Sequence, residues 1–232
     1  AAIIGMLAAT SIGAIWSSCS PDFGKQGVLD RFGQIEPKMI FVVDGYYYNG
    51  KAHDTIERVK SFLDDLPSIE NIVMVEYIQS YQTDIQNCST LSEILSSRQD
   101  NEVDFLRVPF DHPLCILYSS GTTGAPKCIV HGHGGTLLQH LKELQLHADV
   151  RKDDRVFYFT TCSWMMWNWL VSALASKAAV MLYDGSPFYP GAKALWDFAE
   201  AEKFTLFGTS AKYIEALQKA NYSPKSEHNL ES

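Results

Sequence analysis

Strand-like and helix-like segments alternate along this chain, and this alternation restricts the fold more than any other feature. Apolar residues at helical spacing in 28–35 are ended by Pro37 and followed by the β-rich run MIFVVDG at 39–45. The same order recurs in 56–66, before the run NIVMVEYI at 71–78. Alternation of this kind predicts parallel strands connected by helices.

The second half of the chain continues the pattern. Its strand-like runs are CILYSSG, KCIVHGH, RVFYFTT, AAVMLYDG and FTLFGTS, and its helix-like segments are 137–148, 165–176, 193–203 and 211–220. In the first of these segments we expect one buried helical face, made of Leu137, Leu138, Leu141, Leu144 and Ala148. The expected fold class is α/β, with largely parallel sheets covered by helices on both faces.

Composition agrees with a globular protein. The chain has 232 residues, of which 46% are apolar and 20% are charged, enough to bury roughly 70% of the surface of the unfolded form. A net charge of −8 without a cluster of Lys or Arg argues against nucleic acid as a partner. Five scattered cysteines without a Cys-x-x-Cys pair indicate a reducing compartment, so we expect a cytoplasmic protein.

The uncharged run at 1–16 is the one segment that suggests a membrane. Ser, Thr and Gly interrupt it, it falls short of the ~20 strongly apolar residues that a span requires, and no basic residue precedes it. We therefore expect a buried core helix rather than a membrane span or a signal peptide. We divide the chain into a first βα region at 1–78, an exposed polar excursion at 79–112 and a third region at 113–232.

The stretch LYSSGTTGAPKCIVHGHGG at 117–135 carries the strongest chemical signal. A β-run ends in two serines, Gly121 and Gly124 bracket two threonines, and Lys127 follows. Glycines let backbone N–H groups approach an anion, hydroxyls add donors, and lysine supplies positive charge. The stretch predicts a triphosphate-binding loop. It is not the P-loop pattern G-x-x-x-x-G-K-[ST], because Lys127 is three residues from Gly124 and is followed by Cys128, which disfavours a P-loop kinase.

The run SSGTTGAPK at 119–127 resembles the phosphate loop of the adenylate-forming enzymes, the superfamily of acyl-CoA synthetases, luciferases and peptide-synthetase adenylation domains. Further runs resemble the members that join acetoacetate to CoA. These runs are SIGAIWSSCSPDFG at 11–24, DGYYYNGK at 44–51, KCIVHGHGGTLLQHLKE at 127–143, WMMWNW at 164–169, MLYDGSP at 181–187 and GTSAKY at 208–213. The resemblance implies a two-step ligase, in which acetoacetate and ATP give acetoacetyl-AMP and pyrophosphate, and the CoA thiol then displaces AMP.

The resemblance also implies roles for the loop. The loop would hold the β- and γ-phosphates of ATP and their Mg²⁺. The residues with this role would be Ser119, Ser120, Gly121, Thr122, Thr123, Gly124 and Lys127. Lys127 would be catalytic, and Thr122 would contact Mg²⁺ through ATP. Such a loop orients the triphosphate and neutralises its charge while the carboxylate attacks the α-phosphorus. Without the glycines, Lys127 would simply be a solvated surface lysine.

A wall of the acyl pocket is implied at Trp164 and Asn168. These residues are one helical turn apart, so we expect them on one helix face, with the tryptophan limiting the length of the acyl chain. For Met165, Met166 and Trp167 we expect core packing, because Met and Trp at helical spacing are more often core.

Other residues near these motifs have plainer interpretations. The family has Thr-Gly where this chain has Cys162 and Ser163; if that glycine has a positive φ, serine costs about 1 kcal/mol and narrows the pocket. His131 and His133 have no nearby third metal ligand, which favours a structural His131 and an incidental His133. No base is placed beside Cys162, so we expect a buried thiol rather than a nucleophile.

The resemblance finally bears on completeness. The chain starts without Met and ends without a closing element, so we expect part of an N-terminal adenylation domain, with the C-terminal domain absent. The family's acidic magnesium residue, its ribose-binding aspartate and its C-terminal lysine are not found in this sequence. We therefore expect the chain alone to be inactive and the activity to belong to the full-length protein. The alternative is a non-catalytic nucleotide-binding or interaction module on the same scaffold.

Overall fold

The computed structural model describes residues 1–78, 84–97, 102–120 and 124–231. They form two compact units. The first comprises 1–47 and 52–133, and the second comprises 48–51 and 134–232.

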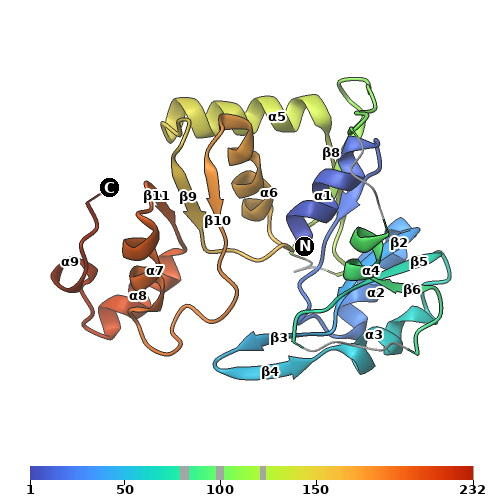
Figure 1. The fold of residues 1–232 in the computed structure, drawn as a ribbon, viewed down its shortest axis with the longest axis horizontal. Helices are drawn as coiled ribbons and strands as arrows, with labels where there is room; N and C mark the ends of the chain where they lie inside the picture. Colours follow the sequence, from blue (N-terminus) through green and yellow to red (C-terminus); the bar gives the residue numbers. More distant parts are fainter. Residues whose placement is uncertain (79–83, 98–101, 121–123, 232) are drawn as a thin grey trace. The chain divides into compact units, whose positions relative to one another are not determined.

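The helices follow the chain in the order shown by the colours of Figure 1. They are α1 (Ala2–Ser11), α2 (Lys25–Ile35), α3 (Ile56–Leu63), α4 (Leu91–Ser96), α5 (His133–Leu141), the π-helical η1 (Lys142–His147), α6 (Met165–Ser172), the 3₁₀-helical η2 (Ala173–Ser176), α7 (Ala194–Glu202), α8 (Ala211–Lys219) and α9 (Pro224–Glu227).

The strands lie in separate small sheets. They are β1 (Trp16–Ser17), β2 (Met39–Val43), β3 (Gly45–Tyr48), β4 (Lys51–Asp54), β5 (Asn71–Val75), β6 (Cys88–Thr90), β7 (Pro113–Tyr118), β8 (Cys128–Gly132), β9 (Arg155–Tyr158), β10 (Ala179–Met181) and β11 (Leu206–Gly208). The sheet orders are β1-β7-β8, β2-β5-β6, β10-β9-β11 and β3-β4. Apart from the antiparallel β7–β8 pair, the three-stranded sheets are parallel, which confirms the expected fold class.

In the second unit, β9 is buried on both faces. Val156 packs with Leu144 and Leu170, on the side of η1 and α6. The next residue, Phe157, packs on the opposite side against residues of α7 and α8. Successive side chains of a strand point to opposite faces, so one apolar run supplies two cores. The expectation of a parallel sheet covered on both faces is confirmed in this unit (Figure 1).

In the first unit, the β2-β5-β6 sheet is the main support. Apolar side chains from β2, β5, α2 and α3 form one buried cluster on one side, and its members are Val28, Phe32, Ile40, Val42, Ile56, Val59, Phe62, Leu66, Ile72 and Met74. Phe41, which alternates with Ile40 and Val42 along β2, instead contacts the Trp16 ring at a centroid distance of 6.3 Å. A side chain at Gly5 of α1 would lie 3.2 Å from that indole, so α1 packs closely on Trp16.

The helix expected at the N-terminus is present, but its burial is limited. Only Gly5 and Met6 of α1 are buried, whereas Ile4 and Leu7 are about half exposed. The expectation of a buried core helix therefore holds only for the face that carries Gly5 and Met6. No helix within the described ranges is both long and apolar enough to cross a membrane.

The helix expected at 137–148 is also present, but only part of its expected face is buried. Leu144 is fully buried and His140 is 9% exposed, whereas Leu137 and Leu138 are 47% and 61% exposed. The helix changes from α to π geometry at Lys142. The exposed Leu137 and Leu138 lie in the α-helical part, before this change, and the buried Leu144 lies after it.

The polar excursion contains a strand that its sequence did not indicate. Within the described residues 84–97 and 102–112, β6 pairs in parallel with β5, and α4 follows it immediately. Thr90 caps α4 by accepting a hydrogen bond from the Glu93 N–H, and the Glu93 carboxylate accepts one from the Thr90 N–H. This capping box explains why a short polar segment forms a helix.

Gly208 at the end of β11 allows a close approach of Tyr158. A Cβ at Gly208 would lie 2.1 Å from the Tyr158 ring. We expect Gly208→Ala to lower the free energy of unfolding by about 1–3 kcal/mol, because the ring must move from its packed position. The measurement is denaturant unfolding, with Gly191→Ala as the matched control, since a Cβ at Gly191 meets nothing within 4 Å. Equal stability of the two variants would contradict this packing.

Candidate functional site

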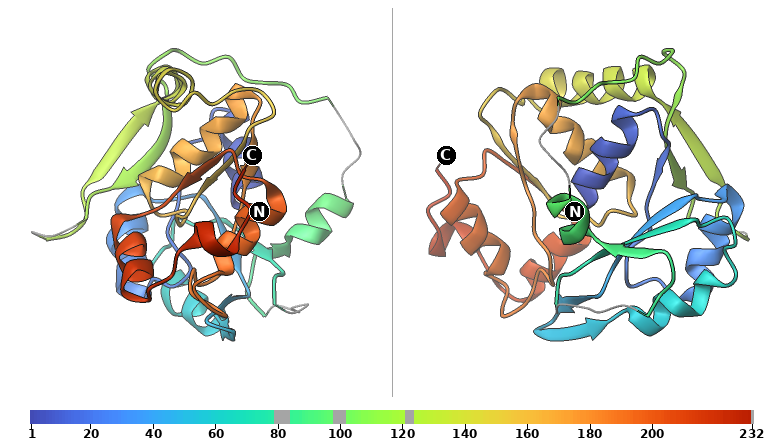
Figure 2. Two further views of the ribbon diagram at one scale, coloured as in Figure 1. Left: turned by 90° about the vertical axis from the view of Figure 1, so that its left-hand side faces the viewer. Right: turned by 45° about the vertical axis from the view of Figure 1, so that its right-hand side comes forward.

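The predicted phosphate loop connects two antiparallel strands. β7 and β8 run side by side as a hairpin, and residues 119–127 join their ends (Figure 2). The loop is closed by a pair of hydrogen bonds: the Ser119 N–H donates to the Lys127 carbonyl at 3.0 Å, and the Lys127 N–H donates to Ser119 Oγ at 2.9 Å. The sequence did not indicate this strand-to-strand connection.

Four of the seven predicted loop residues lie within the described residues. Ser119 is half-buried at the base of the loop, whereas Ser120, Gly124 and Lys127 are exposed. Gly121, Thr122 and Thr123 lie outside the described residues, and so does the predicted contact of Thr122 with Mg²⁺. The two ends of the loop are therefore brought together, with Ser119 and Lys127 as direct neighbours.

Lys127 and Gly124 have properties suited to an anion site. In the part of the chain that the structure describes, no carboxylate forms an ion pair with Lys127, so its charge is available to a ligand. Gly124 has a φ of +146°, a conformation that other residues rarely adopt, and a Cβ there would meet nothing within 4 Å. Backbone geometry, rather than lack of space, is the reason for glycine at this position.

Neighbouring elements hold the base of the loop. Gln34 of α2 donates from Nε2 to the carbonyl of the buried Pro126 at 2.8 Å. The Ser17 hydroxyl donates to the Ile116 carbonyl at 2.9 Å, so the Tyr118 hydroxyl donates to Ser17 Oγ, 2.8 Å away. Burial raises the pKa of Tyr118, which keeps it a neutral donor. The sequence analysis missed Gln34 and Tyr118, because their hydrogen-bond partners are about a hundred residues away in the sequence and no local pattern indicates them.

Two histidines contact each other beside the hairpin. The rings of His112 and His133 are 5.6 Å apart, and His112 Nε2 donates to the Gly13 carbonyl at 2.9 Å. His133 Nε2 is buried and has no hydrogen-bond partner among the described residues. Burial first, and then the charge of His112, lower the pKa of His133 below its ordinary value of 6.5. No group of three or more His, Cys, Asp or Glu in the described chain is placed to hold a metal ion.

The predicted acyl-pocket pair does not share one buried face. Trp164 is the N-cap of α6, with an extended backbone, and its side chain is 65% exposed. Asn168 lies within α6 and is 2% exposed. Among the residues between them, Trp167 is core as expected, Met166 is half-buried, and Met165 is 48% exposed, so the core expectation for Met165 was wrong.

The side chain of Asn168 is an exception to the usual pairing of buried polar groups. Its Nδ2 and Oδ1 atoms are both buried, and neither has a hydrogen-bond partner within the described residues. Leaving a buried donor or acceptor unpaired costs about 1–3 kcal/mol for each group. Asparagine is also a poor helix former. Neither local structure nor packing of this chain therefore explains an asparagine in the apolar run MMWNWLVS.

The backbone of Asn168 is held firmly. The Ser172 hydroxyl donates to the Asn168 carbonyl at 3.0 Å, and it accepts from Nδ1 of the buried His140, 2.8 Å away. The single hydroxyl hydrogen of Ser172 is used toward the carbonyl, so His140 Nδ1 must be the donor of the second bond. This chain of bonds joins the carbonyl of Asn168, through Ser172 at the end of α6, to His140 of α5.

Ser163 and Cys162 lie immediately before Trp164. Among the described residues, those with a positive φ do not include Ser163, so the strain that we considered for it is absent. The Ser163 hydroxyl lies 2.9 Å from that of Thr161. Cys162 is half-buried.

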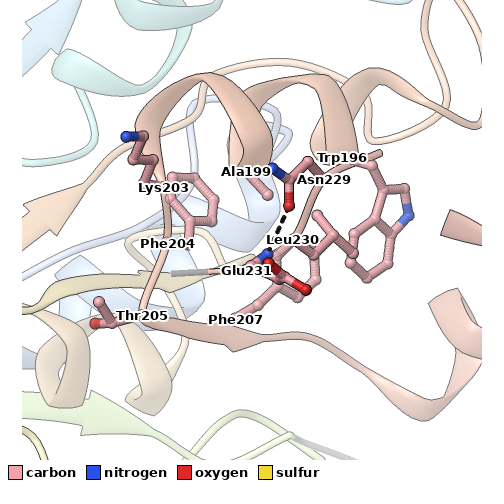
Figure 3. Close-up of a pocket in the computed structure, with 9 residues that line it drawn as sticks. All are labelled: Trp196, Ala199, Lys203, Phe204, Thr205, Phe207, Asn229, Leu230 and Glu231. Carbon is pink, nitrogen blue, oxygen red and sulfur yellow. Dashed lines mark hydrogen bonds between the residues drawn. The ribbon is translucent and has the colours of Figure 1, made fainter. Parts of the chain in front are cut away.

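A cavity of about 230 Å³ lies elsewhere in the second unit, under the last described residues. Phe204 and Phe207 line it beside Asn229, and the Glu231 N–H donates to Asn229 Oδ1 at 3.1 Å (Figure 3). None of the predicted site residues lines this cavity.

Comparisons with known proteins agree with the sequence motifs. Residues 1–232 match the family described as AMP-binding enzyme. The chain is 54% identical over 230 residues to an acetoacetyl-coenzyme A synthetase of Rhizobium meliloti (strain 1021), covering 98% of this chain and 35% of the relative. It is 42% identical over 243 residues to malonamoyl-CoA synthetase vrtB of Penicillium aethiopicum, covering 97% of this chain and 34% of the relative.

A solved structure is similar as well. The acetoacetyl-CoA synthetase from Streptomyces lividans superposes with a TM-score of 0.93 at 45% identity, covering 99% of this chain and 35% of that one. The chain thus spans about a third of the length of the relatives that it matches.

The lowered pKa of His133 makes stability depend on pH. When the pH is below 6.5, the ordinary pKa of histidine, His133 binds a proton in the unfolded chain more readily than in the folded protein. We therefore expect the free energy of unfolding to fall as the pH drops through 6.5 toward the lower pKa of the folded state. Melting temperatures measured between about pH 7.5 and 5.5 test this. His133→Phe should flatten the profile, whereas the exposed His147→Ala should not. An unchanged slope in His133→Phe would exclude His133 as the cause.

Proposed function

Because the chain belongs to the AMP-binding enzyme family, we propose that it is part of an ATP-dependent acid–CoA ligase that converts acetoacetate, ATP and CoA to acetoacetyl-CoA, AMP and diphosphate. The reaction proceeds through an acyl-adenylate. In the first step the acid's carboxylate attacks the α-phosphorus of ATP and diphosphate leaves. In the second step the CoA thiol attacks the acyl carbon and AMP leaves.

The relatives' names support the choice of acid. Acetoacetate and malonamate are both short acids with a carbonyl group on the carbon β to the carboxylate. A site for such acids must accept one polar oxygen near the end of a short chain. We propose that Trp164 and Asn168 form part of this site, with Trp164 limiting the chain length.

The observation that carries the proposal is the closed loop between β7 and β8. Ser119 and Lys127 fix its two ends to each other, so the serine at the start of the loop and the lysine at its end lie side by side. Lys127 has no ion-pair partner among the described residues, and its cation is the natural partner of the β- and γ-phosphates.

Lys127 contributes to the first step by charge. Negative charge builds up on the diphosphate as the bond to the α-phosphorus breaks, and a fixed cation stabilises that charge without reorganisation of water. Mg²⁺ would enter bound to ATP, with Thr122 as its contact in the loop. We place the reaction in the cytoplasm, because all five cysteines lie in the described residues as thiols and none is in a disulfide.

The substrate assignment is tested with the full-length protein. We expect diphosphate release and CoA-thioester formation to be fastest with acetoacetate in a panel that includes acetate, butanoate and malonamate. Equal or faster turnover with acetate or butanoate would refute the acid and leave adenylation intact. Absence of diphosphate release with every acid would favour a non-catalytic module.

Lys127→Ala should lower kcat for adenylation by about a hundredfold to a thousandfold, with little change in KM for the acid, because the charge acts mainly in the transition state. ATP–diphosphate exchange measures this step. Lys225→Ala is the matched control, since Lys225 is an exposed lysine of α9. Unchanged exchange in folded Lys127→Ala would remove Lys127 from the site.

A further inference from the structure

The unpaired carboxamide of Asn168 has the features of a ligand-binding group. It is 2% exposed, and its donor and its acceptor both lack a partner among the described residues. An apolar residue of similar volume would avoid this cost and would suit the helix better. Departures of this kind from local rules are typical of functional positions.

The position of Asn168 in the fold also suits an acid substrate. It lies in α6, which follows the carboxyl end of β9, and ligands of parallel α/β sheets bind beyond the carboxyl ends of the strands. The bonds from Ser172 and His140 hold its backbone in place. A hydrogen-bonding group whose backbone is fixed can bind a substrate atom at one defined position.

We propose that the Asn168 carboxamide recognises the β-carbonyl group of the acid, with Nδ2 donating a hydrogen bond to the β-oxygen, and thereby sets the preference for a 3-oxo acid over an unsubstituted short acid. This inference rests on the proposed ligase function. For acetoacetate, the polarised hydrogens on the carbon between the two carbonyl groups are the donors available to Oδ1, a weaker contact. For malonamate, the terminal amide supplies both an acceptor and a donor.

Recognition requires some rearrangement at the start of α6, because the carboxamide is out of reach of solvent in this chain. The exposed residues nearest along the helix are Trp164 and Met165, at 65% and 48% exposure. Met165 precedes Asn168 by three residues of α6, a spacing at which helical side chains meet, whereas Trp164 is the N-cap and has an extended backbone. We therefore expect the acid to reach Asn168 past Met165, once the start of α6 has rearranged.

The first test compares acids on the full-length protein and on Asn168→Leu, which has a similar volume and no polar atoms. The quantity measured is the ratio of kcat/KM for acetoacetate to kcat/KM for butanoate, which differs from it by lacking the β-carbonyl. We expect this ratio to fall by about tenfold to a hundredfold in the variant. The ratio of malonamate to butanoate should fall in the same way. Unchanged ratios would overturn the proposal.

The second test separates recognition from a structural role. If the carboxamide is unpaired without substrate, Asn168→Leu should raise the melting temperature of the substrate-free protein by a few degrees. A buried water or another part of the full-length protein paired with the amide would instead make the variant less stable, and that result would overturn the proposal. Asn168→Met, whose flexible side chain adapts to the same space, repeats both measurements if the leucine variant does not fold.

A control and an independent readout complete the design. Ser176→Ala removes a buried polar group that already has a partner, Gln145, at 3.2 Å, so it should lower stability and leave the acid ratios unchanged. A wild-type protein that forms no CoA thioester from any acid would refute the proposed function itself. A wild-type protein that does so, with the same ratios in Asn168→Leu, would refute only the role of Asn168.

Discussion

The burial of β9 on both faces is the constraint on which the second unit depends. Val156 and Phe157 are adjacent in sequence and 0% and 1% exposed, and each belongs to a different apolar cluster. A strand in this position needs a helix layer on either side, and parallel neighbours need connections long enough to contain those helices. The segments that leave the strands at their carboxyl ends are therefore gathered along one edge, and the segment from β9 leads directly into α6.

Much of this architecture follows from the sequence, because alternation of strands and helices is a pattern of local residues. The runs around β2, β5, β9 and β11 are β-rich and apolar, and the proline after α2 marks an end. Features that depend on distant partners did not follow. β6 is a short polar strand that pairs with the edge of β5, and the π-helical turn that begins at Lys142 has no signal in the apolar spacing of 137–148.

The candidate site divides in the same way. The loop 119–127 was predicted from its residue types and their order, since glycines, hydroxyl groups and lysine each favour binding of phosphate. Its closure by Ser119 and Lys127 was not predicted, because a glycine-rich turn after a strand can lead to either a helix or another strand. Asn168 was singled out by resemblance alone. Its unpaired amide is a property of the packed helix, which no spacing rule could reveal.

The way the loop is closed affects how its sequence can change between related proteins. A phosphate loop that leads into a helix is constrained at one end by the helix register, whereas this loop leaves and rejoins the sheet at neighbouring positions of one hairpin. Insertions, deletions or new side chains between Ser119 and Lys127 would leave the pairing of β7 with β8 untouched. The loop can therefore change in sequence and length during evolution while the pairing of the strands that carry it stays the same.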